Sequence, residues 1–212
     1  MTLPFDAVLC DFDGVLRFHD PIAQARIDET YGLAPGTVLK TALSPALMGP
    51  ASLGLITCEE WEASLVTALA DVLGSAGRAA RLVEEFAAVP FWIDEEARDL
   101  LAEARRRVPV VLVTNATTRL EEELEHLGMV GFADAVVSSA RVGVAKPDRR
   151  IYEIAAERAG VAVERCLFVD DRPENVAAAV ALGMTGVVYG GPADLRAALA
   201  ASGSPARRDP AR

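Results

Sequence analysis

Five short apolar runs, separated by helical patterns, constrain most strongly what this chain can fold into. The runs cover residues 6–11, 108–114, 134–138, 166–170 and 185–189. They are continuous rather than alternating, which is typical of strands covered by helices on both faces. Strand and helix alternate from residue 108 onward. The sequence therefore predicts an α/β fold built on a doubly wound, parallel, five-stranded sheet.

The segments between these runs carry helix start and stop signals. Asp94 and Asp148 can cap helices, Pro173 suits a first helical position, and Gly183 suits a stop. We expect helices over residues 94–107, 117–128, 148–160 and 173–183, and a last short one around residue 194. The helix over 117–128 would start at either of two threonines, 117 or 118.

The first strand is separated from the rest by about 80 residues that read as helical. Asp20-Pro21 is a cap followed by a first-turn proline, and Thr57 with Glu60 matches a capping box. We expect helices from Thr57 to about residue 73 and over 77–88. Residues 1–16 and 89–200 would form the core, 17–88 an inserted helical cap, and 201–212 a flexible tail. The hinges would lie near residues 16–17 and 89–90.

Composition narrows the possible partners and location. The formal net charge is -10, which disfavours nonspecific binding to nucleic acid or to an anionic membrane. No signal peptide and no membrane span is expected. The three cysteines, Cys10, Cys58 and Cys166, have no metal-ligand spacing and read as free thiols. We expect a cytoplasmic protein, either monomeric or a homodimer.

Polar side chains gather where the predicted strands end. In open α/β sheets, ligands bind at the carboxyl ends of the strands. Those ends, and the loop after the third strand, hold Asp11, Asp13, Thr114, Asn115, Lys146, Asp170 and Asp171. Several carboxylates at one point repel each other unless a cation joins them, and oxygen ligands favour Mg²⁺. With a lysine and a hydroxyl nearby, the set predicts phosphoryl-transfer chemistry.

Four motifs in this order resemble those of the haloacid dehalogenase superfamily, whose members are mostly phosphatases. They are DFDGVL at 11–16, VTNAT at 113–117, VAKPD at 144–148 and FVDDRPEN at 168–175. The resemblance covers nearly all of the predicted sheet domain. It implies a Rossmann-like core, and the helical insertion resembles the family's helical cap of the first type.

The resemblance also implies a role for each residue that reacts with phosphate. Asp11 would be the nucleophile. Asp13 would be the acid that protonates the leaving alcohol and then the base that activates water. Thr114 and Asn115 would hold phosphate oxygens. Lys146 would neutralise the nucleophile and the phosphate.

The implied cofactor is Mg²⁺, held by carboxylates and one carbonyl. Asp11 would ligate it with its side chain and Asp13 with its backbone carbonyl. Asp171 would be a direct ligand, and Asp170 would bind directly or through water. Asn175 would order the fourth-motif loop, unless it is simply a polar residue in the first turn of a helix.

Asp13 favours one reaction over its alternatives, because enzymes that cleave carbon–halogen bonds generally lack this second aspartate. The resemblance implies a Mg²⁺-dependent phosphatase that hydrolyses a sugar phosphate or similar metabolite through an aspartyl-phosphate. A 2-haloacid dehalogenase, a phosphomutase and a non-enzymatic regulatory module are the alternatives. Cap residues that could face the leaving group, none of them assigned a role, are Arg17, Phe18, His19, Met48 and Trp61.

Overall fold

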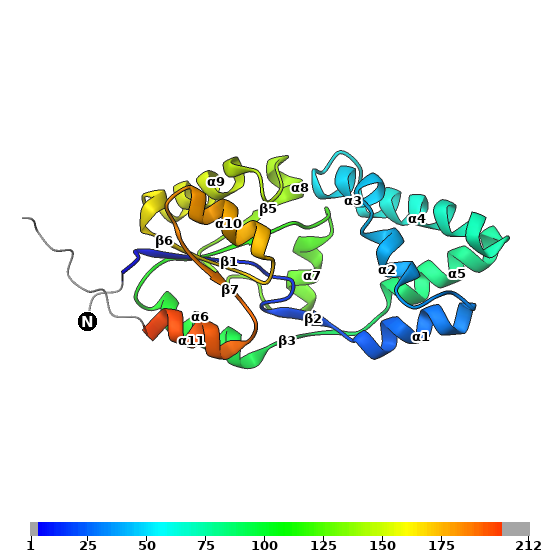
Figure 1. Cartoon of the computed structure of the whole chain (residues 1–212), viewed down its shortest axis with the longest axis horizontal. Coiled ribbons are helices and arrows are strands. Elements are labelled where there is room, and N and C mark those ends of the chain that lie inside the picture. Colours follow the sequence, from blue (N-terminus) through cyan, green and yellow to red (C-terminus); the bar gives the residue numbers. More distant parts are fainter. Residues whose placement is uncertain (1–3, 201–212) are drawn as a thin grey trace, which may run out of the picture.

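The computed structural model describes residues 4–200, and the predicted tail at 201–212 lies outside this range. Figure 1 shows a sheet flanked by helices, joined by a narrow connection to a separate group of helices. The sheet has five strands in the order β5-β4-β1-β6-β7, and every neighbouring pair is parallel. The predicted α/β sheet is confirmed. Its strands are β1 (Ala7–Cys10), β4 (Val110–Thr114), β5 (Ala135–Ser138), β6 (Cys166–Asp170) and β7 (Thr185–Val188).

The register brings the strand ends to one edge. Leu9 in the central strand β1 pairs with Val111 of β4 and with Phe168 of β6. Because these strands are parallel and in this register begin at about the same height in the sheet, their carboxyl ends lie side by side. The loops that follow β1, β4 and β6 therefore meet at a single edge of the sheet.

Helices cover both faces of the sheet, which explains the continuous apolar runs. Val8 and Cys10 pack in one core cluster, with residues of α6 (Glu95–Arg105), α7 (Leu120–His126) and α11 (Pro192–Ala200). Ala7 and Leu9 point the other way, into a second cluster with α9 (Arg149–Ala159) and α10 (Pro173–Ala181). Successive residues of a strand face opposite sides, so a strand covered on both sides has to be apolar throughout.

Most predicted helix starts are confirmed, with one exception. The Asp94 and Asp148 side chains accept hydrogen bonds from backbone N–H groups of α6 and α9. However, α7 begins after Arg119 rather than at the threonines predicted to open it. Thr118 instead accepts a hydrogen bond from the backbone N–H of Cys58 at 3.0 Å, across the gap to the inserted helices. A tertiary contact has replaced the expected cap. Two short elements, α8 (Ser139–Val142) and a 3₁₀ turn (Val163–Arg165), were not predicted.

The inserted segment folds around its own core. Its helices are α1 (Pro21–Tyr31), α2 (Thr37–Ala42), α3 (Pro45–Ser52), α4 (Cys58–Leu73) and α5 (Ala76–Ala87). The predicted capping box at Thr57 is present, with both of its reciprocal hydrogen bonds to Glu60. Leu65 and Leu69 of α4 pack against Leu82 of α5 in a third apolar cluster, away from the sheet. Within residues 4–200, no helix is long and apolar enough to cross a bilayer. We call this group of helices the cap.

The connection between cap and sheet is a two-stranded antiparallel ribbon. It pairs β2 (Arg17–His19) with β3 (Phe91–Ile93). The expectation that residues 17–88 are entirely helical is therefore wrong for residues 17–19, which form a strand. The two linkers are short and run side by side, so each one satisfies the other's backbone groups and both become extended.

Candidate active site

A sharp turn after β1 carries the first two aspartates. The backbone N–H of Asp11 still donates to Val169 of β6 at 2.8 Å, so Asp11 is fixed by the end of the ladder. Gly14 then turns the chain with φ of 79°, a conformation that favours glycine. A Cβ at Gly14 would lie 2.6 Å from the nearer carboxylate oxygen of Asp171. The glycine is therefore needed for both its conformation and its lack of a side chain.

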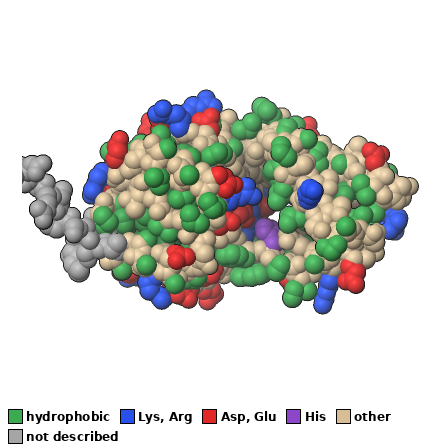
Figure 2. All heavy atoms as spheres, viewed as in Figure 1, with side chains coloured by type: hydrophobic (Ala, Val, Ile, Leu, Met, Phe, Trp, Pro, Cys, Tyr) green, Lys and Arg blue, Asp and Glu red, His purple; other side chains and the backbone are tan. Residues whose placement is uncertain are grey.

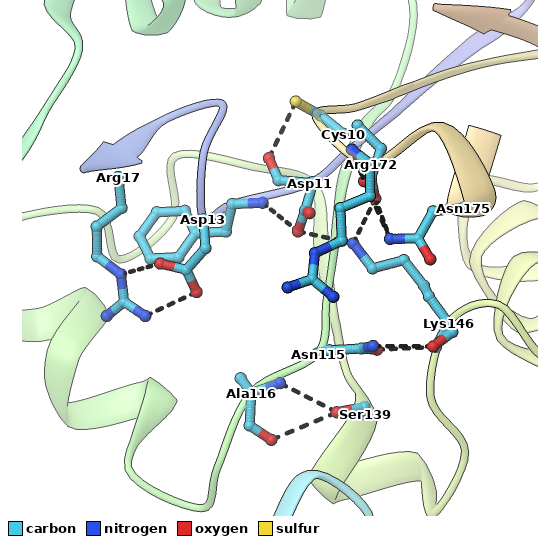
Figure 3. Close-up of polar contacts among 12 residues, drawn as sticks. Cys10, Asp11, Asp13, Arg17, Asn115, Ala116, Ser139, Lys146, Arg172 and Asn175 are labelled. Atoms are coloured by element: carbon cyan, nitrogen blue, oxygen red, sulfur yellow. Dashed lines mark hydrogen bonds and ion pairs between the residues drawn. The ribbon is translucent and has the colours of Figure 1, made fainter. Parts of the chain in front are cut away.

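Lys146 lies between two carboxylates in the interior (Figure 3). Its Nζ is 2.7 Å from Asp11 Oδ1 and 2.7 Å from Asp170 Oδ2, and all three side chains are buried. Burial raises the pKa of Asp11 to about 8, with Lys146 acting in the opposite direction and Asp170 adding to the rise. One lysine facing two buried carboxylates leaves the cluster short of positive charge, so a further cation would stabilise the ionised form of Asp11.

The two aspartates that end β6 have different surroundings. Asp170 is buried and accepts hydrogen bonds from Lys146, from the Asn175 amide at 3.0 Å and from the backbone N–H of Arg172 at 2.8 Å. Asp171 is exposed at the cavity. Its pKa is raised, first by partial desolvation and then by the charge of Asp170. Asp171 is therefore the more available of the two for an additional ligand.

The donor set fits the metal implied by the sequence. Carboxylate oxygens of Asp11, Asp170 and Asp171 lie within 4.8 Å of one another. All three offer oxygen, the ligand that Mg²⁺ prefers, and Mg²⁺ commonly binds one or two carboxylates together with substrate phosphate. Asn175 bonds both oxygens of Asp170, which agrees with the ordering role expected for it.

Thr114 presents a buried hydroxyl that lacks a partner. It is the last residue of β4, it is 1% exposed, and it lines the same cavity as Asp11. Among the described residues, none forms a hydrogen bond with its Oγ1. Leaving a buried hydroxyl unpaired costs about 1–3 kcal/mol, so such groups call for an explanation. A phosphate oxygen bound in the cavity would supply the missing partner.

Asn115 has a use that the sequence did not suggest. Its Nδ2 donates to the backbone carbonyl of Lys146 at 2.9 Å, and its Oδ1 accepts from the backbone N–H of Lys146 at 2.8 Å. The side chain expected to hold phosphate thus holds the lysine loop in place. Ser139, which the sequence reading missed, acts similarly, because its hydroxyl bonds both backbone groups of Ala116. Such links depend on loop positions and leave no sequence signal.

Asp13 is held by a neighbour from the ribbon. Arg17 of β2 contacts both of its carboxylate oxygens, at 2.6 and 2.9 Å (Figure 3). Arg17 also pairs with Glu123 of α7. These carboxylates raise the pKa of Arg17 further above its ordinary value, although burial opposes them. From the sequence, Arg17 is expected only as one of the residues that could face the leaving group. Its spacing of four residues from Asp13 was the one available signal.

The sheet edge that carries these side chains opens into a cavity of about 450 Å³ between sheet and cap. Figure 2 shows the hollow between the two parts, with acidic, basic and histidine side chains gathered beside it. Asp11, Asp13, Thr114, Lys146 and Asp171 all line this cavity from the core side.

The cap is held over the cavity by an ion pair, and it contributes part of the lining. Arg119, just before α7, contacts Glu62 at 2.5 Å and Glu59 at 2.9 Å, both on α4. Met48 and Trp61 from the cap and His19 from the ribbon face the cavity. Phe18 does not line it and stacks on Trp92 instead.

These features define a class of protein, and the chain belongs to the haloacid dehalogenase-like hydrolases. The sequence profile of that family matches residues 5–183. Phosphatase MT3486 of Mycobacterium tuberculosis is 39% identical over 92 residues, which is 42% of each chain. The GMP/IMP nucleotidase YrfG of Escherichia coli is 28% identical over 84% of this chain and 80% of its own length.

Solved structures share the fold. A family enzyme from Bacteroides thetaiotaomicron, BT-2542 in its magnesium complex, has a TM-score of 0.67 at 19% identity, over 86% of this chain and 92% of that one. The L-2-haloacid dehalogenase of Xanthobacter autotrophicus has a TM-score of 0.57 at 22% identity, over 86% and 76%. At these identities the likeness establishes a common fold.

Proposed function

We propose that this protein is a Mg²⁺-dependent phosphatase that hydrolyses a small phosphate monoester through an aspartyl-phosphate. The observation that carries the proposal is the convergence of Asp11, Lys146 and the unpaired Thr114 hydroxyl on one cavity. A nucleophile, a cation and a neutral donor are the groups that a transferring phosphoryl group requires. The family relatives named above as a phosphatase and a nucleotidase agree with this reaction.

The reaction would proceed in two displacements. A carboxylate oxygen of Asp11 attacks phosphorus, the bond from phosphorus to the alcohol oxygen breaks, and Asp13 in its protonated form gives that oxygen its proton. This step requires one oxygen of Asp13 to leave its contact with Arg17. Asp13 then takes a proton from water as the water oxygen attacks phosphorus and releases Asp11. Lys146 and the Thr114 hydroxyl stabilise the negative charge on the phosphate oxygens. Asp11, Asp171 and the backbone carbonyl of Asp13 would hold Mg²⁺, and Asp170 would bind it directly or through water. The ion would help to neutralise the negative charge of the phosphate.

Asp13 also separates this proposal from a dehalogenase. A halide needs no proton to leave, whereas an alkoxide does. Asp13 lines the cavity and lies on the turn that follows Asp11. Likeness to a solved dehalogenase extends to the fold and does not favour that reaction.

Phosphate release from p-nitrophenyl phosphate tests the proposal, with Mg²⁺ and after its removal by EDTA. Asp11→Asn should lower kcat on the order of 10⁴-fold or more, because the nucleophile is lost. Asp71→Asn is the matched control, since Asp71 is exposed on the cap helix α4. Full turnover by the Asp11 variant would rule out the covalent route. Halide release from 2-haloacids without phosphate release would favour the dehalogenase.

A further inference from the structure

The part of the cavity farthest from Asp11 is walled by apolar side chains of the cap and ribbon. Figure 1 shows the cap helices and the sheet domain as two parts joined at one side by β2 and β3. The apolar lining residues are Leu39, Ala42, Leu43, Met48, Trp61, Phe86, Ala87, Val89 and Phe91. Since the phosphate must sit against Asp11 and Lys146, this wall faces the group attached to it.

The charged side chains that the cap and the ribbon place beside this wall are already paired. Among the cap residues that line the cavity, all within the described range, Glu62 is the one charged side chain, and it contacts Arg119. Arg17 is paired with Glu123, a partner that does not depend on the protonation state of Asp13. Arg172, which directly follows Asp171 on the core side, also lines the cavity, and among the described residues no carboxylate pairs with its guanidinium. A carboxylate or second phosphate on the leaving group would lose its water here without gaining a cation from the cap.

Two leucines leave apolar surface open to this space. Leu39 is 37% exposed and Leu43 47% exposed, and both line the cavity. The polar edge of Trp61 is already used, because its Nε1 donates to the backbone carbonyl of Ala42 at 3.2 Å. Besides Arg17 and Glu62, the polar side chains that the cap and ribbon add to the lining are His19, Gln24 and Ser52. The wall itself thus offers a bound group mainly apolar area, and covering that area would be favourable.

We propose that the substrate's leaving group is an uncharged, mainly apolar alcohol that packs against this wall. The proposal rests on the phosphatase function above and narrows its substrate class. It places an alkyl or aryl monophosphate ahead of a sugar phosphate or a phosphorylated acid.

A homologous series of ethyl, butyl and hexyl phosphate tests the idea. These alcohols have nearly the same acidity, so the chemical step is constant and only the buried area changes. We expect kcat/KM to rise by about two- to fourfold for each added methylene that is buried. Hexyl phosphate should exceed glucose 6-phosphate, also six carbons long, by at least about tenfold. 3-Phosphoglycerate and O-phosphoserine should be the poorest substrates.

A flat series, or a preference for glucose 6-phosphate or 3-phosphoglycerate, would overturn the inference and leave the phosphatase intact. No phosphate release from any ester, p-nitrophenyl phosphate included, would overturn both. The Leu43→Arg variant adds a cation to the wall and should flatten the alkyl series while improving 3-phosphoglycerate. Leu55→Arg is the matched control, because Leu55 is exposed and lies outside the cavity. Unchanged selectivity in Leu43→Arg would also contradict the proposal.

Discussion

At the scale of single residues, Thr114 connects stability with function most directly. Its hydroxyl is buried at the end of β4 without a partner among the described residues. Such a group is costly to the free protein and becomes useful only when a ligand supplies an oxygen. Stability and activity should therefore respond to this side chain with opposite signs.

Thr114→Val keeps the shape of the side chain and removes the hydroxyl. We expect the free energy of unfolding to rise by about 1 kcal/mol, since an unsatisfied buried group is lost. We expect kcat/KM to fall by about 10- to 100-fold, which corresponds to one hydrogen bond to a charged group. Urea unfolding and steady-state kinetics measure the two effects. Thr114→Ser should retain most of the activity, and a valine variant as active as the original would exclude contact with phosphate.

Asp13→Asn should discriminate between leaving groups. Butyl phosphate should lose about 10²- to 10⁴-fold in kcat/KM, because its alkoxide needs a proton. p-Nitrophenyl phosphate should lose less, since p-nitrophenolate leaves without one. A burst of p-nitrophenol would also appear if the missing base slows hydrolysis of the aspartyl-phosphate. Equal losses for the two esters would contradict the acid role.

At the scale of elements, the strands and most helices could be predicted because their signals are local. Continuous apolar runs identified the sheet, and capping residues such as Thr57 and Asp94 identified helix starts. The ribbon and the late start of α7 depend on partners distant in sequence, which no local pattern encodes. The residues at the strand ends could be placed together because each strand end has a local signal. The contacts of Arg17 and Asn115 with their partners could not be predicted, because they depend on the tertiary arrangement of loops.

The capping box of α4 gives an element-scale prediction. Thr57→Ala removes the hydroxyl that accepts from the backbone N–H of Glu60. Losing such a cap should lower the free energy of unfolding by about 1 kcal/mol. Thr67→Ala, the same change at an exposed position inside α4, is the control and should have little effect. Thermal unfolding followed by circular dichroism compares them, and equal shifts would contradict a specific capping role.

At the scale of the whole molecule, two bodies with separate cores share one cavity. The sheet has an apolar cluster on each face, and the cap has its own. The contacts between cap and sheet domain include the ion pair of Arg119 with Glu62 and the hydrogen bond that the Cys58 backbone N–H donates to Thr118. Ligands that bind between them should therefore stabilise the molecule as a unit.

Mg²⁺ should raise the melting temperature in the absence of substrate. Binding at about 100 times the dissociation constant adds about 2.7 kcal/mol to the free energy of unfolding. The effect should disappear with EDTA and in Asp171→Asn, because Asp171 is the exposed carboxylate of the cluster. Asp71→Asn should keep the full shift. Thermal melting measures this without reference to activity, and an undiminished shift in the Asp171 variant would show that the ion binds elsewhere.

The ribbon has a consequence for how this architecture can vary. The chain leaves the sheet domain at His19 and returns at Phe91, and these residues face each other across the ribbon. A short turn joining them would close β2 and β3 into an ordinary hairpin and leave the strand order of the sheet unchanged. The cap is thus an inserted module whose two covalent connections to the sheet domain lie side by side, in β2 and β3. Exchange of that module between enzymes would change the cap wall of the cavity while Asp11, Lys146 and the other carboxylates at the sheet edge stay in place.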